Sequence, residues 1–183
     1  MNKAYIFLAD GFEEIEGLTV VDILRRAGIE IRMISIMGRK QITGSHGIVV
    51  EADEVFENAD LEDGTLLILP GGMPGTRYLG AHKELGELLQ KAAVSGRQVA
   101  AICAAPSVLG GLGLLKGRKA TCYPGFEDQL TGAEVSMEPV VVSGNVTTSR
   151  GMGTAIPFAL TLVAGIQGQE AADQLGKSII YQK

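Results

Sequence analysis

The sequence predicts a doubly wound α/β fold, in which helices cover both faces of a mostly parallel β-sheet. Short apolar runs, typical of strands buried on both faces, alternate with helix-length amphipathic segments along the 183 residues. The 25 glycines are spread along the chain between these segments, as many short turns require. No internal repeat or linker divides the sequence, so we expect one domain, residues 1–183.

The first half of the chain predicts three strands, two helices and a hairpin. An apolar run from Tyr5 leads into a turn at Asp10–Gly11, and the acids Glu13 and Glu14 favour the first turn of a helix. The expected strands are 5–8, 29–36 and 66–69, the expected helices are 13–27 and 83–95, and a hairpin is expected at 41–51. The apolar side chains of the first helix are Ile15, Leu18, Val21 and Leu24.

The second half continues the alternation with a strand that ends at Cys103. The next helix begins near Pro106, which suits a first helical turn. Gly144 and Asn145 separate two short apolar runs, the pattern of a β-hairpin. The remaining expected elements are a strand at 119–123, hairpin strands at 140–143 and 146–149, and helices at 154–167 and 169–180.

Composition excludes several classes of protein. The formal net charge is −5 and no run of Lys and Arg occurs, so a nucleic-acid partner is not expected. No segment approaches the length of a membrane span, and the apolar run before Asp10 is too short for a secretory signal. We therefore expect a cytoplasmic protein whose two cysteines are free thiols.

The segment around Cys103 predicts a sharp turn from strand to helix. Ala101 and Ala105 flank the cysteine at a distance of two residues, and small side chains are needed where strand and helix nearly touch. Such a turn exposes the sulfur near the positive end of a helix, which lowers the pKa of a thiol. The alternative is a buried structural cysteine, a common core residue.

Three peptides of interest follow buried strands, at the edge where ligands bind in such sheets: Asp10–Glu16, Pro70–Gly75 and Cys103–Pro106. Gly71 and Gly72 offer backbone N–H groups that could hold a developing oxyanion, although a pair of turn glycines is the simpler interpretation.

An acid from the first helix could contact the sulfur. Glu13, Glu14 and Glu16 all qualify, and the sequence alone does not choose among them; an exposed surface glutamate is the alternative for each. A carboxyl group and a thiol in one dry pocket would share a proton, which provides a nucleophile and a general acid together.

Histidine is scarce, which disfavours a Cys-His hydrolase. The chain has only His46 and His82, and Ala104 follows the nucleophile candidate. The two cysteines and two histidines lack zinc-like spacing, so no metal site is expected. Cys122 could act as a resolving thiol, but a passive core residue is the simpler interpretation.

With these residues in place, nearly the whole chain resembles the ThiJ/PfpI superfamily, in the branch of the Parkinson's-disease-associated deglycase and its bacterial relatives. Four segments in the same order carry the resemblance: Ala9–Glu16, Leu69–Gly72, Ala100–Pro106 and Thr148–Thr154.

The resemblance implies a flavodoxin-like sandwich, like that of class I glutamine amidotransferases, and a homodimer. It places the nucleophile at Cys103 and the protonated carboxyl partner at Glu16. It also implies further site residues: Gly71, Gly72 and Ala104 on the oxyanion side, and Tyr123, Arg150 and His46 lining the site. Tyr123 stands where many relatives have a histidine, and His46 stands where some relatives have an arginine that reaches the site from the partner subunit, so both departures bear on substrate preference.

The residues and the resemblance together suggest a cofactor-free glyoxalase or deglycase. Its substrates would be methylglyoxal, glyoxal or their early adducts with amines and thiols, attacked by Cys103 with Glu16 as general acid and base. The alternative is an oxidation-sensing stress protein or chaperone in which Cys103 is the redox sensor.

Overall fold

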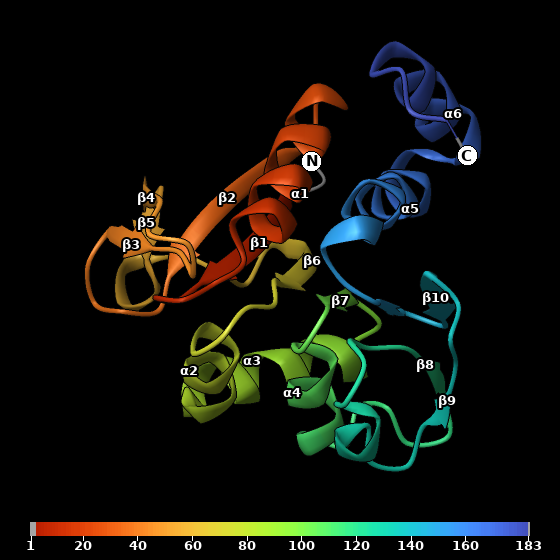
Figure 1. Cartoon of the computed structure of the whole chain (residues 1–183). Helices are drawn as coiled ribbons and strands as arrows, with labels where there is room; N and C mark the ends of the chain where they lie inside the picture. Colours follow the sequence, from red (N-terminus) through yellow and green to blue (C-terminus); the bar gives the residue numbers. More distant parts are fainter. Residues whose placement is uncertain (1–2, 183) are drawn as a thin grey trace.

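The apolar runs form a seven-stranded sheet at the centre of the structure, a computed structural model that describes residues 3–182 (Figure 1). Its strands are β1 (Lys3–Leu8), β2 (Glu30–Ser35), β5 (Glu54–Val55), β6 (Gly64–Leu69), β7 (Gln98–Ile102), β10 (Val140–Ser143) and β11 (Val146–Ser149). Their order is β10-β11-β7-β6-β1-β2-β5. All neighbours are parallel except β10 and β11, which form the expected antiparallel hairpin.

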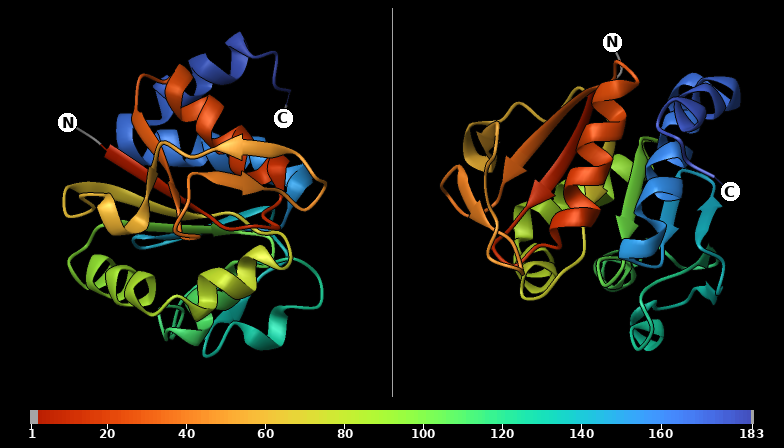
Figure 2. Two further views of the ribbon diagram at one scale, coloured as in Figure 1. Left: turned by 90° about the vertical axis from the view of Figure 1, so that its left-hand side faces the viewer. Right: turned by 45° about the horizontal axis from the view of Figure 1, so that its top comes forward.

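Helices cover both faces of this sheet, which confirms the doubly wound α/β prediction (Figure 2). One face carries α1 (Glu14–Arg26), α5 (Ala155–Gln167) and α6 (Gln169–Ser178); the other carries α2 (Gly75–Ala81), α3 (Lys83–Val94) and α4 (Pro106–Gly111). Among residues 3–182, no helix has the length and apolar character needed to cross a bilayer.

The sheet separates two hydrophobic cores because successive side chains of a strand point to opposite faces. In β1, Ile6 and Leu8 pack into the core that also contains Leu24 of α1. Tyr5 and Phe7, which alternate with them, pack into the core under α2, α3 and α4. All four side chains are almost fully buried, so β1 reads as a continuous apolar run in the sequence.

At the centre of the sheet, two adjacent strands are followed by helices on opposite faces. From β1 it continues into α1 on one face, whereas from the neighbouring strand β6 it continues into α2 on the other face. The ends of these two strands therefore form the topological switch point, the place where ligands bind in open α/β sheets. The carboxyl end of β7, next to β6, adds Cys103 to this edge.

Two small sheets lie outside the main one. The hairpin expected at 41–51 is β3 (Gln41–Thr43) and β4 (Val49–Glu51), which pair only with each other. The strand expected at 119–123 is only β8 (Lys119–Ala120), paired with β9 (Glu134–Val135). It stops because the chain then turns toward the β7 end, where the Tyr123 N–H donates to the carbonyl of Cys103 at 2.8 Å. Three 3₁₀ turns complete the fold: Phe56–Asn58, Glu127–Gln129 and Met152–Thr154.

The helices differ from the sequence prediction in two respects. Helix α2 is absent from the sequence prediction because it is seven residues long, contains two glycines and buries only one large apolar side chain, Leu79. In α1, Ile15 is 50% exposed, whereas Glu14 and Glu16 are buried. In the first turn of α1, the acidic side chains therefore face the edge of the sheet, whereas the apolar side chain of Ile15 faces solvent.

Two neighbouring glycines of α4 provide a matched test of this packing. A Cβ at Gly110 would lie 2.1 Å from the carbonyl oxygen of Gln129, whereas a Cβ at Gly111 would meet no atom within 4 Å. We expect Gly110→Ala to lower the free energy of unfolding by about 1–3 kcal/mol through overpacking. Gly111→Ala should leave it unchanged or raise it by up to about 1 kcal/mol. Urea unfolding of both variants measures this, and equal midpoints would contradict the packing at Gly110.

Candidate active site

Cys103 forms the turn between β7 and α4 in a strained backbone conformation. Its φ is +66°, in the left-handed region that L-residues other than glycine rarely adopt. The turn is fixed on both sides, because the Cys103 N–H donates to Ser149 O and its carbonyl accepts from the Tyr123 N–H. Ala101 and Ala105 are fully buried beside it, as the small residues of such a turn must be. The side chain of Cys103 remains partly exposed.

Glu16 lies against this sulfur. The carboxyl group is buried, with the residue only 1% exposed, and it forms a hydrogen bond with the thiol of Cys103. Its Oε2 also accepts a hydrogen bond of 3.0 Å from the Gly71 N–H. Of the three acids that the sequence left open, Glu16 is therefore the one that contacts Cys103.

Two glycines leave room around this pair, and at Gly71 a larger residue would not fit. A Cβ at Gly71 would lie 2.5 Å from both the Cβ of Cys103 and the Oε2 of Glu16. A Cβ at Gly151 would lie 3.2 Å from the ring of Tyr123. Gly151 forms a wall of the site that the residue-by-residue reasoning missed; its place just after the strand at 146–149 was the available signal.

Backbone N–H groups reach the sulfur from two sides. Gly72 and Ala104 both direct an N–H to the thiol of Cys103. The N–H of Gly71 is already bonded to Glu16. Of the two glycines singled out in the sequence, only Gly72 is thus placed to hold negative charge that develops at the sulfur or at an attached atom.

Burial dominates the protonation of the pair. It raises the pKa of Glu16 to about 7, although hydrogen bonds from Cys103 and Gly71 act in the opposite direction. Burial and then the charge of Glu16 raise the pKa of Cys103 to about 12, while the N–H groups of Ala104 and Gly72 lower it. The prediction of a lowered thiol pKa is wrong, because the strand end is buried next to a carboxylate. Near neutral pH the two groups share one proton.

The other two acids of this helix start face the loop between β3 and β4. The Oε1 of Glu14 accepts a hydrogen bond of 2.7 Å from the backbone N–H of His46, and its Oε2 lies 2.9 Å from the Nδ1 of that residue. Burial acts to raise the pKa of Glu14, but these hydrogen bonds outweigh it and hold the pKa at about 2. His46 is therefore beside Glu14, and the structure gives it no contact with Cys103.

The remaining predicted residues differ in their placement. Tyr123 is half exposed and lies over Gly151, at the mouth of the site. The charge of Arg150 acts on Cys122 rather than on Cys103. Cys122 is buried, and burial raises its pKa to about 11, as expected for a passive core thiol.

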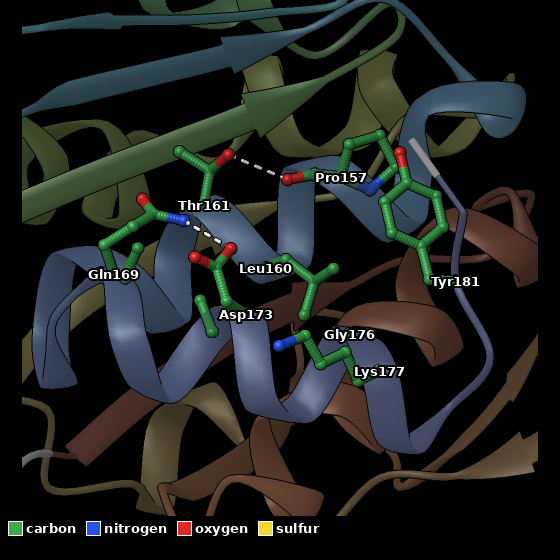
Figure 3. A pocket seen from close by; sticks show the side chains of 10 residues that line it. Pro157, Leu160, Thr161, Gln169, Asp173, Gly176, Lys177 and Tyr181 are labelled. Atoms are coloured by element: carbon green, nitrogen blue, oxygen red, sulfur yellow. Dashed lines mark hydrogen bonds between the residues drawn. The ribbon is translucent and has the colours of Figure 1, made fainter.

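A separate groove of about 610 Å³ lies between α5 and α6 (Figure 3). Its polar side chains largely bond within the groove: Thr161 Oγ1 donates to the carbonyl of Pro157, and Gln169 Nε2 donates to Asp173. None of the predicted site residues lines it. The groove is therefore lined by a different set of residues from the site at Cys103.

The raised pKa of Glu16 has a measurable cost in stability. The folded protein keeps a proton that the unfolded chain, with its pKa of 4.5, releases as the pH rises toward 7. The penalty is absent below pH 4.5, grows to about 3 kcal/mol by pH 7 and then stays constant. We therefore expect Glu16→Gln to be more stable than the wild type at pH 8 by up to about 3 kcal/mol, with little difference at pH 4.

Urea unfolding at both pH values measures this difference. Glu57→Gln, which changes an exposed glutamate, serves as the matched control and should follow the wild type. A Glu16→Gln protein whose stability has the same pH dependence as the wild type would contradict the burial of an ionisable Glu16.

The comparisons with known proteins agree on one family. The DJ-1/PfpI family model matches residues 2–165. Protein DJ-1 homolog B of Arabidopsis thaliana is 37% identical over 185 residues, 99% of this chain but only 42% of that protein, so the chain spans less than half of it. A Pyrococcus abyssi protein named as a deglycase is 35% identical, covering 81% of this chain and 89% of that protein. A Caenorhabditis elegans protein named as a glutathione-independent glyoxalase is 32% identical, covering 93% and 91%.

Solved structures give the same result. The structure titled "Toxoplasma gondii DJ-1, oxidized" is 34% identical, with a TM-score of 0.96 and complete coverage of both chains. This agreement confirms the flavodoxin-like sandwich that the resemblance implied. The chain belongs to the DJ-1/PfpI family.

Proposed function

We propose that this protein is a cysteine-dependent, cofactor-free glyoxalase or deglycase. Its substrates would be methylglyoxal, glyoxal or their early adducts with amines and thiols. The names of the Pyrococcus and Caenorhabditis relatives support an enzyme of this kind. The observation that carries the proposal is the buried hydrogen bond between Glu16 and Cys103, together with the two N–H groups directed at the sulfur.

The first step is attack by Cys103 on the aldehyde carbon. The reactive form has the shared proton on Glu16, which leaves a thiolate held by the N–H groups of Gly72 and Ala104. A bond forms between the sulfur and the aldehyde carbon, and the carbonyl oxygen takes up the proton from Glu16. The product of this step is a hemithioacetal. The same N–H groups stabilise the oxygen while it is negative.

Glu16 then acts in its ionised form. It removes the proton from the carbon bonded to sulfur, giving an enediolate, and returns that proton to the neighbouring carbon, while the hydroxyl proton of the first carbon moves to the oxygen of the second. The result is a thioester of a hydroxy acid. Water cleaves this thioester, so that the hydroxy acid leaves and Cys103 is restored. A pKa near 7 suits Glu16 to both giving and taking a proton at neutral pH.

A second candidate function is oxidation sensing at the same thiol. The oxidised state named for the Toxoplasma relative supports it, as does the partial exposure of Cys103. The raised pKa of Cys103 limits the thiolate population for peroxide attack and for attack on an aldehyde alike. Only the catalytic reaction also uses a buried carboxyl group with a pKa of about 7, which can give and take a proton, so catalysis is the function we favour.

The proposal also includes a homodimer. Three apolar side chains near the start of α1 and α5 are exposed, with Ile15 at 50%, Met152 at 51% and Ile156 at 37%. Leu18 and Ile156 line a groove of about 460 Å³ between α1 and the C-terminal helices. Burial of this patch against a second copy would remove apolar surface from water beside the site.

The enzyme proposal predicts lactate formation from methylglyoxal in the absence of glutathione. We expect Cys103→Ser to abolish turnover and Glu16→Gln to reduce it by about 100-fold or more. Cys122→Ala, which changes the buried second cysteine, should retain activity and serves as the matched control. Enzymatic assay of lactate over time measures all four proteins.

The opposite result would favour the second candidate. A wild-type protein that forms no lactate or glycolate, but whose Cys103 is converted to sulfinic acid by mild peroxide, would overturn the enzyme proposal. Intact-protein mass spectrometry detects that conversion.

The dimer proposal predicts twice the mass of the chain in size-exclusion chromatography with light scattering. Ile15→Lys and Ile156→Glu should each shift the protein toward the monomer, because a charge would be buried in the interface. Val94→Lys changes an exposed apolar residue of α3 and should leave the dimer intact. A wild-type monomer at micromolar concentration would contradict the proposal.

A further inference from the structure

Two carboxylates and an imidazole converge where the start of α1 meets the loop between β3 and β4. The Nδ1 of His46 lies 2.9 Å from Glu14 Oε2 and 3.5 Å from Glu13 Oε2. The hydroxyl of Ser45 lies 3.2 Å from each of these two carboxylate oxygens and 3.0 Å from Nδ1. One nitrogen and three oxygens, two of them from carboxylates, thus surround a common point.

These separations match the donor spacing of a metal site. A zinc ion with bonds of about 2.0–2.2 Å to nitrogen and oxygen has tetrahedral edges of about 3.3–3.6 Å. The ligand atoms of Glu13, Glu14 and His46 all lie within 4.8 Å of one another. The separation of 3.5 Å from His46 to Glu13 falls within that range, and the separation of 2.9 Å from His46 to Glu14 is somewhat shorter. Small side-chain movements would therefore suffice to accommodate an ion.

The surroundings hold Glu14 in position for such a role. Its Oε1 accepts the backbone N–H groups of His46, at 2.7 Å, and of Ile48, at 3.4 Å. These bonds leave Oε2 directed at the imidazole, as outer hydrogen bonds orient metal-binding carboxylates. Gly44 allows the close approach of the loop, because a Cβ there would lie 2.3 Å from Glu14 Oε1.

The donor set also indicates the class of ion. An imidazole with two carboxylates suits zinc and related divalent transition metals, whereas Mg²⁺ and Ca²⁺ prefer oxygen ligands alone. Two carboxylates and a neutral imidazole balance the charge of a divalent cation. The side chain of His46 is 68% exposed, so an ion can enter from solvent. We propose that Glu13, Glu14 and His46 bind a divalent transition-metal ion, and Zn²⁺ is the ion we take as representative.

The cluster was not visible in the sequence because its residues are far apart along the chain. Glu14 and His46 are 32 positions apart and meet only because the loop packs on the helix start. The expectation of no metal site rested on the spacing of cysteines and histidines, which does not detect a set with a single histidine.

Isothermal titration calorimetry with Zn²⁺ tests the proposal on the full chain carrying Cys103→Ser, since a thiol beside Glu16 could itself bind zinc. We expect one Zn²⁺ per chain with a Kd of about 1 μM or tighter. His46→Ala should weaken binding by about 100-fold and Glu13→Gln by about 10-fold. His82→Ala is the matched control, because the Nδ1 of His82 also lies near a carboxylate, 3.6 Å from Glu84, and binding should not change.

A second readout uses Co²⁺ in place of Zn²⁺. A tetrahedral site gives visible absorption bands that excess Zn²⁺ removes and that His46→Ala abolishes. Binding that survives His46→Ala, or that is weak and exceeds one ion per chain, would overturn the proposal. Because these proteins lack the thiol of Cys103, neither result depends on the proposed enzymatic reaction.

Discussion

The buried hydrogen bond between Glu16 and Cys103 is the constraint on which the surrounding structure depends. A carboxyl group and a thiol can share one proton only if both are kept from water and held in contact. Gly71 and Gly151 provide the room, since a Cβ at Gly71 would occupy the space of both groups. The positive φ of Cys103 directs the sulfur toward Glu16, and a strained conformation of this kind persists only where its surroundings fix it.

The start of α1 shows how environment, rather than residue type, sets the behaviour of an acid. Glu14 and Glu16 are both buried from solvent, but Glu16 is enclosed more deeply, and the pKa of Glu14 is held at about 2 whereas that of Glu16 is raised to about 7. Glu14 accepts hydrogen bonds from the backbone and side chain of His46, which stabilise its charge. Glu16 has one backbone donor and a thiol that competes for the same proton. The first acid fixes a loop, and the second remains able to exchange a proton.

The sequence predicted the features that depend on local pattern and missed those that depend on tertiary contacts. Apolar runs identified β1, β6 and β7, and small residues identified the turn at Cys103, because these follow from packing rules that act within a few residues. The exposure of Ile15 was not predictable, because the helix start is oriented by the site and not by its apolar side chains. The raised pKa of Cys103 was missed for the same reason, since its causes are burial and then a carboxylate 87 positions earlier, both of which arise only in the folded chain.

The topology of the sheet explains why the site lies where it does. Because α1 and α2 leave adjacent strands for opposite faces, the ends of β1 and β6 separate and admit Glu16 from one side and Gly71 from the other. The neighbouring strand β7 then supplies Cys103 from a third direction. No single loop contributes more than one of these groups, so a shift of any one element would break the hydrogen bond that links them. The two hydrophobic cores on either side of the sheet keep the three strand ends in register, and in this way the stability of the fold maintains the geometry of the site.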